Sequence, residues 1–222
     1  MKRIYILILA VMVAMSAGFA QDKARKEREE IRKMAEKELN SRVDKTVAKE
    51  AKKLEKDGWK VRPGALPLEK QLEKSYMMQY EYDEDLYPKY IMGEATSVGE
   101  NYDAAKTTAM SLAINNLAGQ IQTEVTALIE NTVVNKQLTA EEAVSISETV
   151  MSSKQLISQT LGRTLPVMEC FRLNGKNNTE VLMRIAYKGT EAKRVAADAV
   201  RKKLDEKGEK LSEQLDKILG LE

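Results

Sequence analysis

The chain lacks histidine altogether and contains a single cysteine, Cys170. Without histidine it cannot form a Ser-His-Asp or Cys-His nucleophilic pair, or a zinc site with histidine ligands. A single cysteine cannot form an intrachain disulfide. Cys170 is therefore expected either to lie buried in a strand as a small apolar side chain or to pair between chains. The sequence predicts no catalytic residues, no cofactor and no metal.

Aromatic residues are also scarce, at 5% of the 222 residues, with one Trp and two Phe. The core must therefore be built from Leu, Ile, Val, Met and Ala. The length suits one ordinary domain with extensions, or two small domains.

Residues 1–20 have the form of a secretory signal peptide, with a basic start, an apolar run over residues 4–15 and small residues up to Ala20. The apolar run is shorter than the roughly 20 residues that a membrane-spanning helix needs. We therefore expect cleavage between Ala20 and Gln21, leaving no integral membrane segment. No cysteine stands directly after these small residues, since the single cysteine is Cys170, so lipidation at the signal site is not expected. The mature protein is predicted to be periplasmic or associated with the outer membrane.

The charge balance argues against a nucleic-acid partner. The chain has 36 Lys and Arg and 34 Asp and Glu, and residues 1–20 contain only two charged residues, Lys2 and Arg3. The mature chain is therefore expected to be neutral, whereas a nucleic-acid-binding protein needs a basic face that neutralises phosphates.

Residues 21–88 are predicted to form a helical N-terminal extension. Residues 22–57 are rich in good helix formers, and Gly58 follows as a stop signal. One narrow apolar stripe recurs in steps of three and four, at Ile31, Met34, Ala35, Leu39, Val43, Val47, Ala51 and Leu54. Two interpretations remain open: a helix packed on its own domain, or a coiled-coil helix that docks a protein partner or a second copy.

The segment over residues 59–87 gathers most of the aromatic residues of the extension. Trp59 lies at a corner before Pro-Gly, and Tyr76, Tyr80 and Tyr82 lie in or just after a helix opened by Pro67. Trp59 is expected to anchor the turn, and the tyrosines to end a solvated helix. The alternative is a carbohydrate- or small-ligand-binding module that uses these four aromatic side chains and the acids beside them.

Three of those acids, Glu81, Asp83 and Asp85, are the only candidates for a hydrolase that works with carboxylates alone. A general acid must be buried so that its pKa rises, whereas this charged neighbourhood indicates solvation. The acids also lack the spacing of a calcium-binding loop. A non-enzymatic role is therefore predicted.

Residues 89–188 are predicted to form a small α+β domain. Its expected elements are a strand over 89–98, a helix over 101–119, a long strand over 120–134, a helix over 139–153, and a second long strand over 155–173 that a hairpin at Asn174-Gly175 joins to a strand over 179–187. Residues 189–222 are predicted to be a C-terminal helix. The fold class is thus α+β: a small, mostly antiparallel sheet covered by an alanine-rich helix, with long charged N- and C-terminal helices.

Two local patterns support this order. Gly93 and Ala95 lie on one face of the first strand, where small side chains let a helix approach closely. Thr139 and Glu142 have the spacing of a capping box, which marks the start of a helix.

The motif Gly93-Glu94-Ala95, followed by an alanine-rich helix from Ala104 to Ala118 and a C-terminal hairpin, resembles the LPP20-like envelope domain of bacterial surface lipoproteins. The resemblance covers roughly residues 89–188. It implies a cell-envelope protein of undefined molecular role, of a kind found among secreted proteins of Bacteroides-type bacteria. We expect an exported structural or protein-interaction module whose flanking helices contact a protein partner or a second copy.

Overall fold

The computed structural model describes residues 33, 45–83, 87–134, 138–174, 178–208 and 210–221. The chain divides into two compact units, Met1–Lys45 and Thr46–Glu222. In the first unit the described residues are Lys33 and Lys45, which are both helical. The predicted signal peptide, its cleavage site and most of the predicted helix over 22–57 therefore lie outside the described residues.

A three-stranded antiparallel sheet forms the centre of the second unit. β1 (Tyr90–Gly99) lies at one edge, β3 (Thr179–Lys188) in the middle and β2 (Leu165–Leu173) at the other edge. β2 and β3 form the predicted hairpin, and β1 pairs with β3 along its whole length. The α+β class and the small antiparallel sheet are thus confirmed.

Helix α3 (Tyr102–Val134) covers one face of this sheet. It begins where predicted, because the Asn101 side chain accepts a hydrogen bond from the Ala104 amide at 2.9 Å. Its alanine-rich face is fully buried over β1, where a Cβ added to Gly93 would stand 2.4 Å from the Ala113 carbonyl oxygen. The small residues on this face of β1 therefore serve close packing, as predicted.

The predicted strand over residues 120–134 is wrong, since α3 continues through Gly119 to Val134. Its Val and Thr residues suit a strand, but burial follows a helical period: Ile121, Val125 and Ile129 are at most 1% exposed, whereas Thr123 is exposed. Packing of this continuous apolar face outweighs the local preference of β-branched residues for strands.

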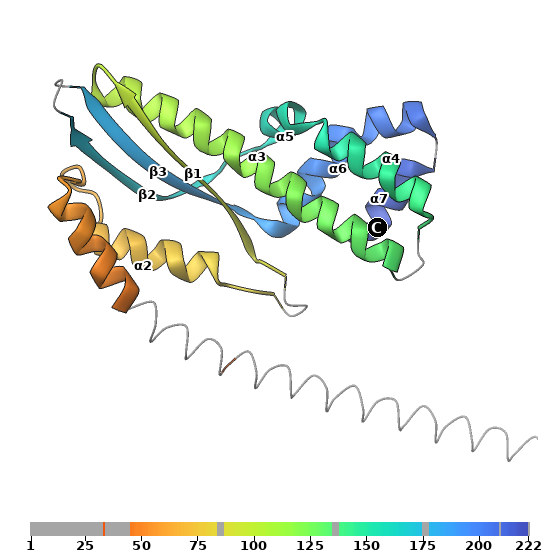
Figure 1. Ribbon diagram of the computed structural model, residues 1–222, viewed down its shortest axis with the longest axis horizontal. Helices are drawn as coiled ribbons and strands as arrows, with labels where there is room; N and C mark the ends of the chain where they lie inside the picture. Colours follow the sequence, from red (N-terminus) through yellow and green to blue (C-terminus); the bar gives the residue numbers. More distant parts are fainter. Residues whose placement is uncertain are drawn as a thin grey trace, which may run out of the picture. The chain divides into compact units, whose positions relative to one another are not determined.

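The second half of α3 is enclosed by later helices (Figure 1). These are α4 (Ala140–Met151), α5 (Lys154–Thr160), α6 (Gly189–Lys207) and α7 (Leu211–Leu219). The Thr139–Glu142 capping box is present at the start of α4, as predicted. The predicted C-terminal helix is two helices joined at Gly208, and its apolar side chains, such as Leu204 and Leu215, are buried in this cluster.

The predicted long strand over residues 155–173 is also wrong in its first half. Residues 154–160 form α5, whose Ile157 is fully buried, and β2 begins only at Leu165. A register shift lies between Pro166 and Met168. Pro166 is tolerated there because β2 is an edge strand, where a missing backbone donor costs little.

The opposite face of the sheet is covered by α2 (Leu68–Gln79) and by a helix over residues 46–56 (Figure 1). The latter ends at Lys56, and Gly58, the predicted stop signal, follows it with a φ of 85°. Apolar side chains from both helices are buried on this side, and with the sheet they form a second, smaller core: Val47, Ala51, Leu68, Leu72, Met168 and Cys170.

Candidate functional site

The four aromatic residues named as a possible ligand or partner surface, Trp59, Tyr76, Tyr80 and Tyr82, fall into two groups. Trp59 is buried, at 7% exposure, and Tyr76 is half-buried. Tyr80 and Tyr82 are exposed, at 39% and 44%. The structure therefore assigns the first two to packing and leaves the second two at the surface.

Trp59 anchors the corner after residues 46–56 against the free edge of β2. Lys60 and Phe171 exchange backbone hydrogen bonds of 2.8 Å in both directions. The Arg172 guanidinium lies 4.6 Å from the centre of the Trp59 ring and also pairs with Glu180 at 2.6 Å. The Lys60 backbone therefore pairs with the edge of β2, and the buried Trp59 side chain beside it packs as expected of a turn anchor.

Tyr76 links α2 to the neighbouring helix and to the sheet. Its hydroxyl donates to the Glu50 carboxylate at 2.5 Å, and its ring lies 6.0 Å from the Arg184 guanidinium. Arg184 in turn donates to Ser75 at 2.8 Å and pairs with Glu94, its neighbour on β1. The hydrogen bond to Glu50, then burial, then the Glu50 charge raise the pKa of Tyr76 to about 12.

The raised pKa of Tyr76 predicts a loss of stability at alkaline pH. The folded-state pKa lies above the ordinary 10.0, so the contribution of this hydroxyl is complete below pH 10 and is lost as the pH rises towards 12. Tyr76→Phe should remove part of this pH dependence, measured by urea unfolding across the window. Tyr82→Phe, at an exposed position, is the control; equal pH slopes in the two variants would contradict the prediction.

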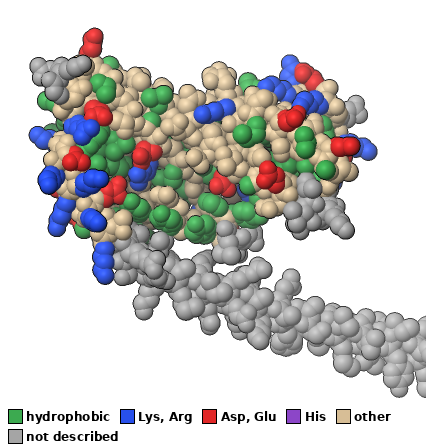
Figure 2. Space-filling model, viewed as in Figure 1, with side chains coloured by type: hydrophobic (Ala, Val, Ile, Leu, Met, Phe, Trp, Pro, Cys, Tyr) green, Lys and Arg blue, Asp and Glu red, His purple; other side chains and the backbone are tan. Residues whose placement is uncertain are grey.

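Three exposed tyrosines remain, and we name Tyr80, Tyr82 and Tyr87 the exposed tyrosine segment. Each is 39% to 44% exposed, and Met77 beside them is 37% exposed. The Tyr80 ring stacks on the Tyr76 ring, with 6.3 Å between the ring centres, so one face of the Tyr80 ring contacts Tyr76. Figure 2 shows apolar side chains gathered along this α2 side of the unit.

The acids beside these tyrosines serve local structure. Glu81 pairs with Lys89 at 2.5 Å, and Asp83 accepts a hydrogen bond from the Tyr87 amide at 2.9 Å. Asp85, the third hydrolase candidate, lies outside the described residues. Among the residues that the structure describes, no group of three or more His, Cys, Asp or Glu is placed to hold a metal ion.

Cys170 is fully buried in the smaller core. It pairs with Leu182, which lies between the main-core residues Val181 and Met183 on β3, so Cys170 and Leu182 point to the opposite, α2 side of the sheet. Burial, then the nearby Glu94 carboxylate, raises the pKa of its thiol to about 12. Of the two expectations for this residue, the structure shows the buried apolar side chain.

A polar cleft of about 450 Å³ lies beside β1, and its residues were not predicted as a site. It is lined by residues of α2, β1, β3, α3 and α5, which include Gln79, Glu94, Asn116, Gln120, Lys154 and Arg184. Asn116 and Gln120 are four residues apart, so on one continuous helix they share a side, and this spacing could have indicated the cleft. Because the helix predicted from the sequence ended at Gly119, the two residues were not placed together.

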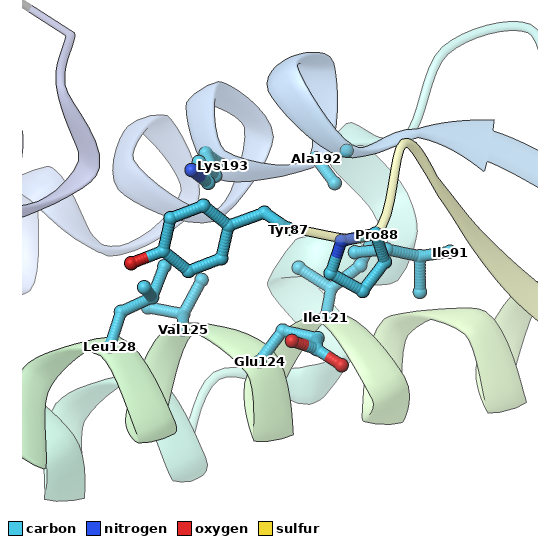
Figure 3. A pocket seen from close by; sticks show the side chains of 10 residues that line it. Tyr87, Pro88, Ile91, Ile121, Glu124, Val125, Leu128, Ala192 and Lys193 are labelled. Carbon is cyan, nitrogen blue, oxygen red and sulfur yellow. The ribbon is translucent and has the colours of Figure 1, made fainter. Parts of the chain in front are cut away.

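A second hollow is apolar and much smaller. Figure 3 shows the Tyr87 ring lying over Val125 and Leu128 of α3, beside Lys193 of α6, whose Nζ lies 4.7 Å from the ring centre. The cavity holds about 20 Å³. One water molecule needs roughly 10–15 Å³ by the same kind of measure, so this space suits little more than a water.

No helix among the described residues is long and apolar enough to cross a membrane. Comparison of the chain with protein-family models, with curated proteins and with solved structures gave no match.

Proposed function

We propose that this chain is an exported cell-envelope protein without catalytic activity, and that it works by binding another protein through the exposed tyrosine segment. The form of residues 1–20 supports export, with cleavage between Ala20 and Gln21. Residue 21 is Gln and not Cys, which supports a periplasmic or outer-membrane-associated protein that is not lipidated at the signal site. The resemblance to LPP20-like envelope domains agrees with this location.

The observation that carries the proposal is a difference in burial: the tyrosines are exposed, whereas the described apolar side chains of the flanking helices are mostly buried. The apolar side chains of α6 and α7 are buried within the unit, as are Val47 and Ala51 of the N-terminal stripe. Tyr80 and Tyr82 are left exposed, although Tyr is a residue type that protein interfaces favour. We therefore place the contact surface here, not on α6 or α7; the stripe residues before Val47 lie outside the described residues.

The way this fold uses its aromatic rings indicates the chemistry of the partner. Four rings each hold a cationic side chain within 4.5 to 6.0 Å: Trp59 with Arg172, Tyr76 with Arg184, Tyr87 with Lys193, and Tyr102 with Arg62. Within the described residues, Tyr80 and Tyr82 have no such contact. Their rings therefore suit a partner surface that presents Arg or Lys.

The acids that a carboxylate hydrolase would need do not favour that activity. Glu81 is paired with Lys89, and Asp83 closes a local turn. A ligand-binding module built on residues 59–87 also has fewer groups to offer than the sequence indicated. Trp59 and Tyr76 are engaged in packing, which leaves Tyr80, stacked on Tyr76 on one side, and Tyr82 as its exposed rings.

The double variant Tyr80→Ser with Tyr82→Ser should lose partner binding while keeping the fold. The mature chain, immobilised and exposed to envelope extract, should retain a protein that the variant retains about tenfold less, because each lost aromatic contact is worth roughly 0.5–1 kcal/mol. High salt should weaken the same complex.

The matched control replaces two exposed apolar residues of α4, Val144→Ser with Met151→Ser, at 56% and 54% exposure. This control should bind as the unaltered chain does. Equal recovery by all three proteins would place the contact surface elsewhere.

A further inference from the structure

We propose that the polar cleft beside β1 binds a small, neutral, hydroxyl-rich molecule such as a short saccharide. Its volume of about 450 Å³ falls within the roughly 300–1,000 Å³ typical of small-ligand sites. It shares no residue with the exposed tyrosine segment, so it is independent of the partner surface proposed above.

The cleft brings together elements that are far apart in the sequence. Gln79 ends α2, Glu94 lies on the free edge of β1, Asn116 and Gln120 share one side of α3, and Lys154 begins α5. The sheet and the long helix hold these groups, so their positions do not depend on a loop. Sites on such rigid elements keep their geometry better than sites on loops.

The floor of the cleft is an ion pair that is already fixed in place. Arg184 donates to Glu94 through Nε and Nη2, and to Ser75 through Nη1 at 2.8 Å. Both contacts to Glu94 use Oε2. Its Oε1, on a side chain that is 44% exposed, accepts no hydrogen bond from the described residues.

The walls supply groups that both donate and accept hydrogen bonds. The Asn116 amide nitrogen donates to the Glu94 carbonyl oxygen at 2.8 Å, which orients its own oxygen as a free acceptor. The side chains of Gln79, Gln120 and Lys154 are exposed, and within the described part of the chain they make no hydrogen bond or ion pair. These amides, the ammonium and the carboxylate oxygen therefore stay available to a ligand.

The mixture of charges decides the class of ligand. Arg184 balances the charge of Glu94, so Lys154 is the one lining charge without a counter-charge in the cleft. Because Lys154 is exposed, solvent and salt screen its attraction for an anion, and it repels a cation. A hydroxyl group donates and accepts at once, so it can satisfy an amide, a carboxylate oxygen or an ammonium in turn. Met92 on the same wall adds an apolar surface for the carbon face of a sugar ring.

The test is an NMR titration of the mature chain with chitobiose, cellobiose and maltose. At least one disaccharide should shift the side-chain amide signals of Asn116 and Gln120 in a saturable way. The double variant Gln120→Ala with Lys154→Ala should weaken that binding about tenfold, as expected when one or two hydrogen bonds are lost. Asn115→Ala, outside the cleft on the same helix, should bind normally.

Three outcomes would overturn the proposal. The first is no saturable shift with any of the disaccharides at tens of millimolar. The second is unchanged binding by the double variant when its amide spectrum shows an intact fold. The third is equal or tighter binding of glutarate, a dianion without hydroxyl groups, which would make the cleft an anion site.

Discussion

Gly93→Ala should destabilise the folded unit by about 1–3 kcal/mol, the cost of forcing an extra methyl group into a packed core. The new Cβ would stand 2.4 Å from the Ala113 carbonyl oxygen and 2.7 Å from the Leu117 Cβ. Neither atom is the end of a flexible side chain, so β1 and α3 would have to separate. The gain from a stiffer unfolded chain, roughly 0.4–1 kcal/mol, would offset only part of this loss. Urea unfolding followed by circular dichroism measures the change.

Gly119→Ala is the matched control for that substitution. The nearest atoms to its added Cβ belong to the flexible end of Lys154, at 3.4 Å, and the residue lies inside α3. We expect a gain of up to about 1 kcal/mol, because alanine favours the helix more than glycine does. If both substitutions had the same small effect, the close contact between α3 and β1 would be contradicted.

Thr123→Pro should cost about 3 kcal/mol or more, because Thr123 lies in the middle of α3. Proline removes the amide donor and its ring clashes with the carbonyl of Gly119 one turn earlier. The Thr123 hydroxyl, which donates to that carbonyl at 3.1 Å, is lost as well. The kink would disturb the packing of α4, α6 and α7 on the second half of α3. The measurement is again the free energy of unfolding.

The companion substitution Thr123→Ala tests whether residues 120–134 form a helix, as in the structure, or the strand that their local preference predicts. At this exposed position, alanine should stabilise a helix by a few tenths of a kcal/mol, whereas it should weaken a strand. A clear loss of stability with alanine would therefore contradict a continuous α3.

The elements that the sequence predicts well are those set by local chemistry. Four features depend on neighbouring residues, and each agrees with the structure: the alternation in β1, the hairpin pairing of β2 with β3, the Thr139–Glu142 capping box and the stop at Gly58. In residues 120–134, local preference and packing disagree. Ile121, Val125 and Ile129 follow a helical period, but the run of Thr and Val around them favours a strand.

The candidate sites were harder to predict because they depend on partners far away in the chain. Trp59 and Tyr76 belong to the same aromatic segment as Tyr80 and Tyr82. They differ because Arg172 and Arg184, more than a hundred residues later, lie against their rings. No local pattern distinguishes the packed rings from the exposed ones. The polar cleft could have been suspected only after α3 had been extended through Gly119, which places Gln120 beside Asn116.

The most direct test of the proposed working surface is site-specific cross-linking in cells. A photoreactive amino acid would replace Tyr82 in one strain and Val144 on α4 in another, both at exposed positions. We predict that the protein recovered from the envelope fraction begins at Gln21. Illumination should yield a discrete adduct from position 82 and none from position 144. A chain that retains residues 1–20 in the cytoplasm, or adducts of equal yield from both positions, would contradict the account.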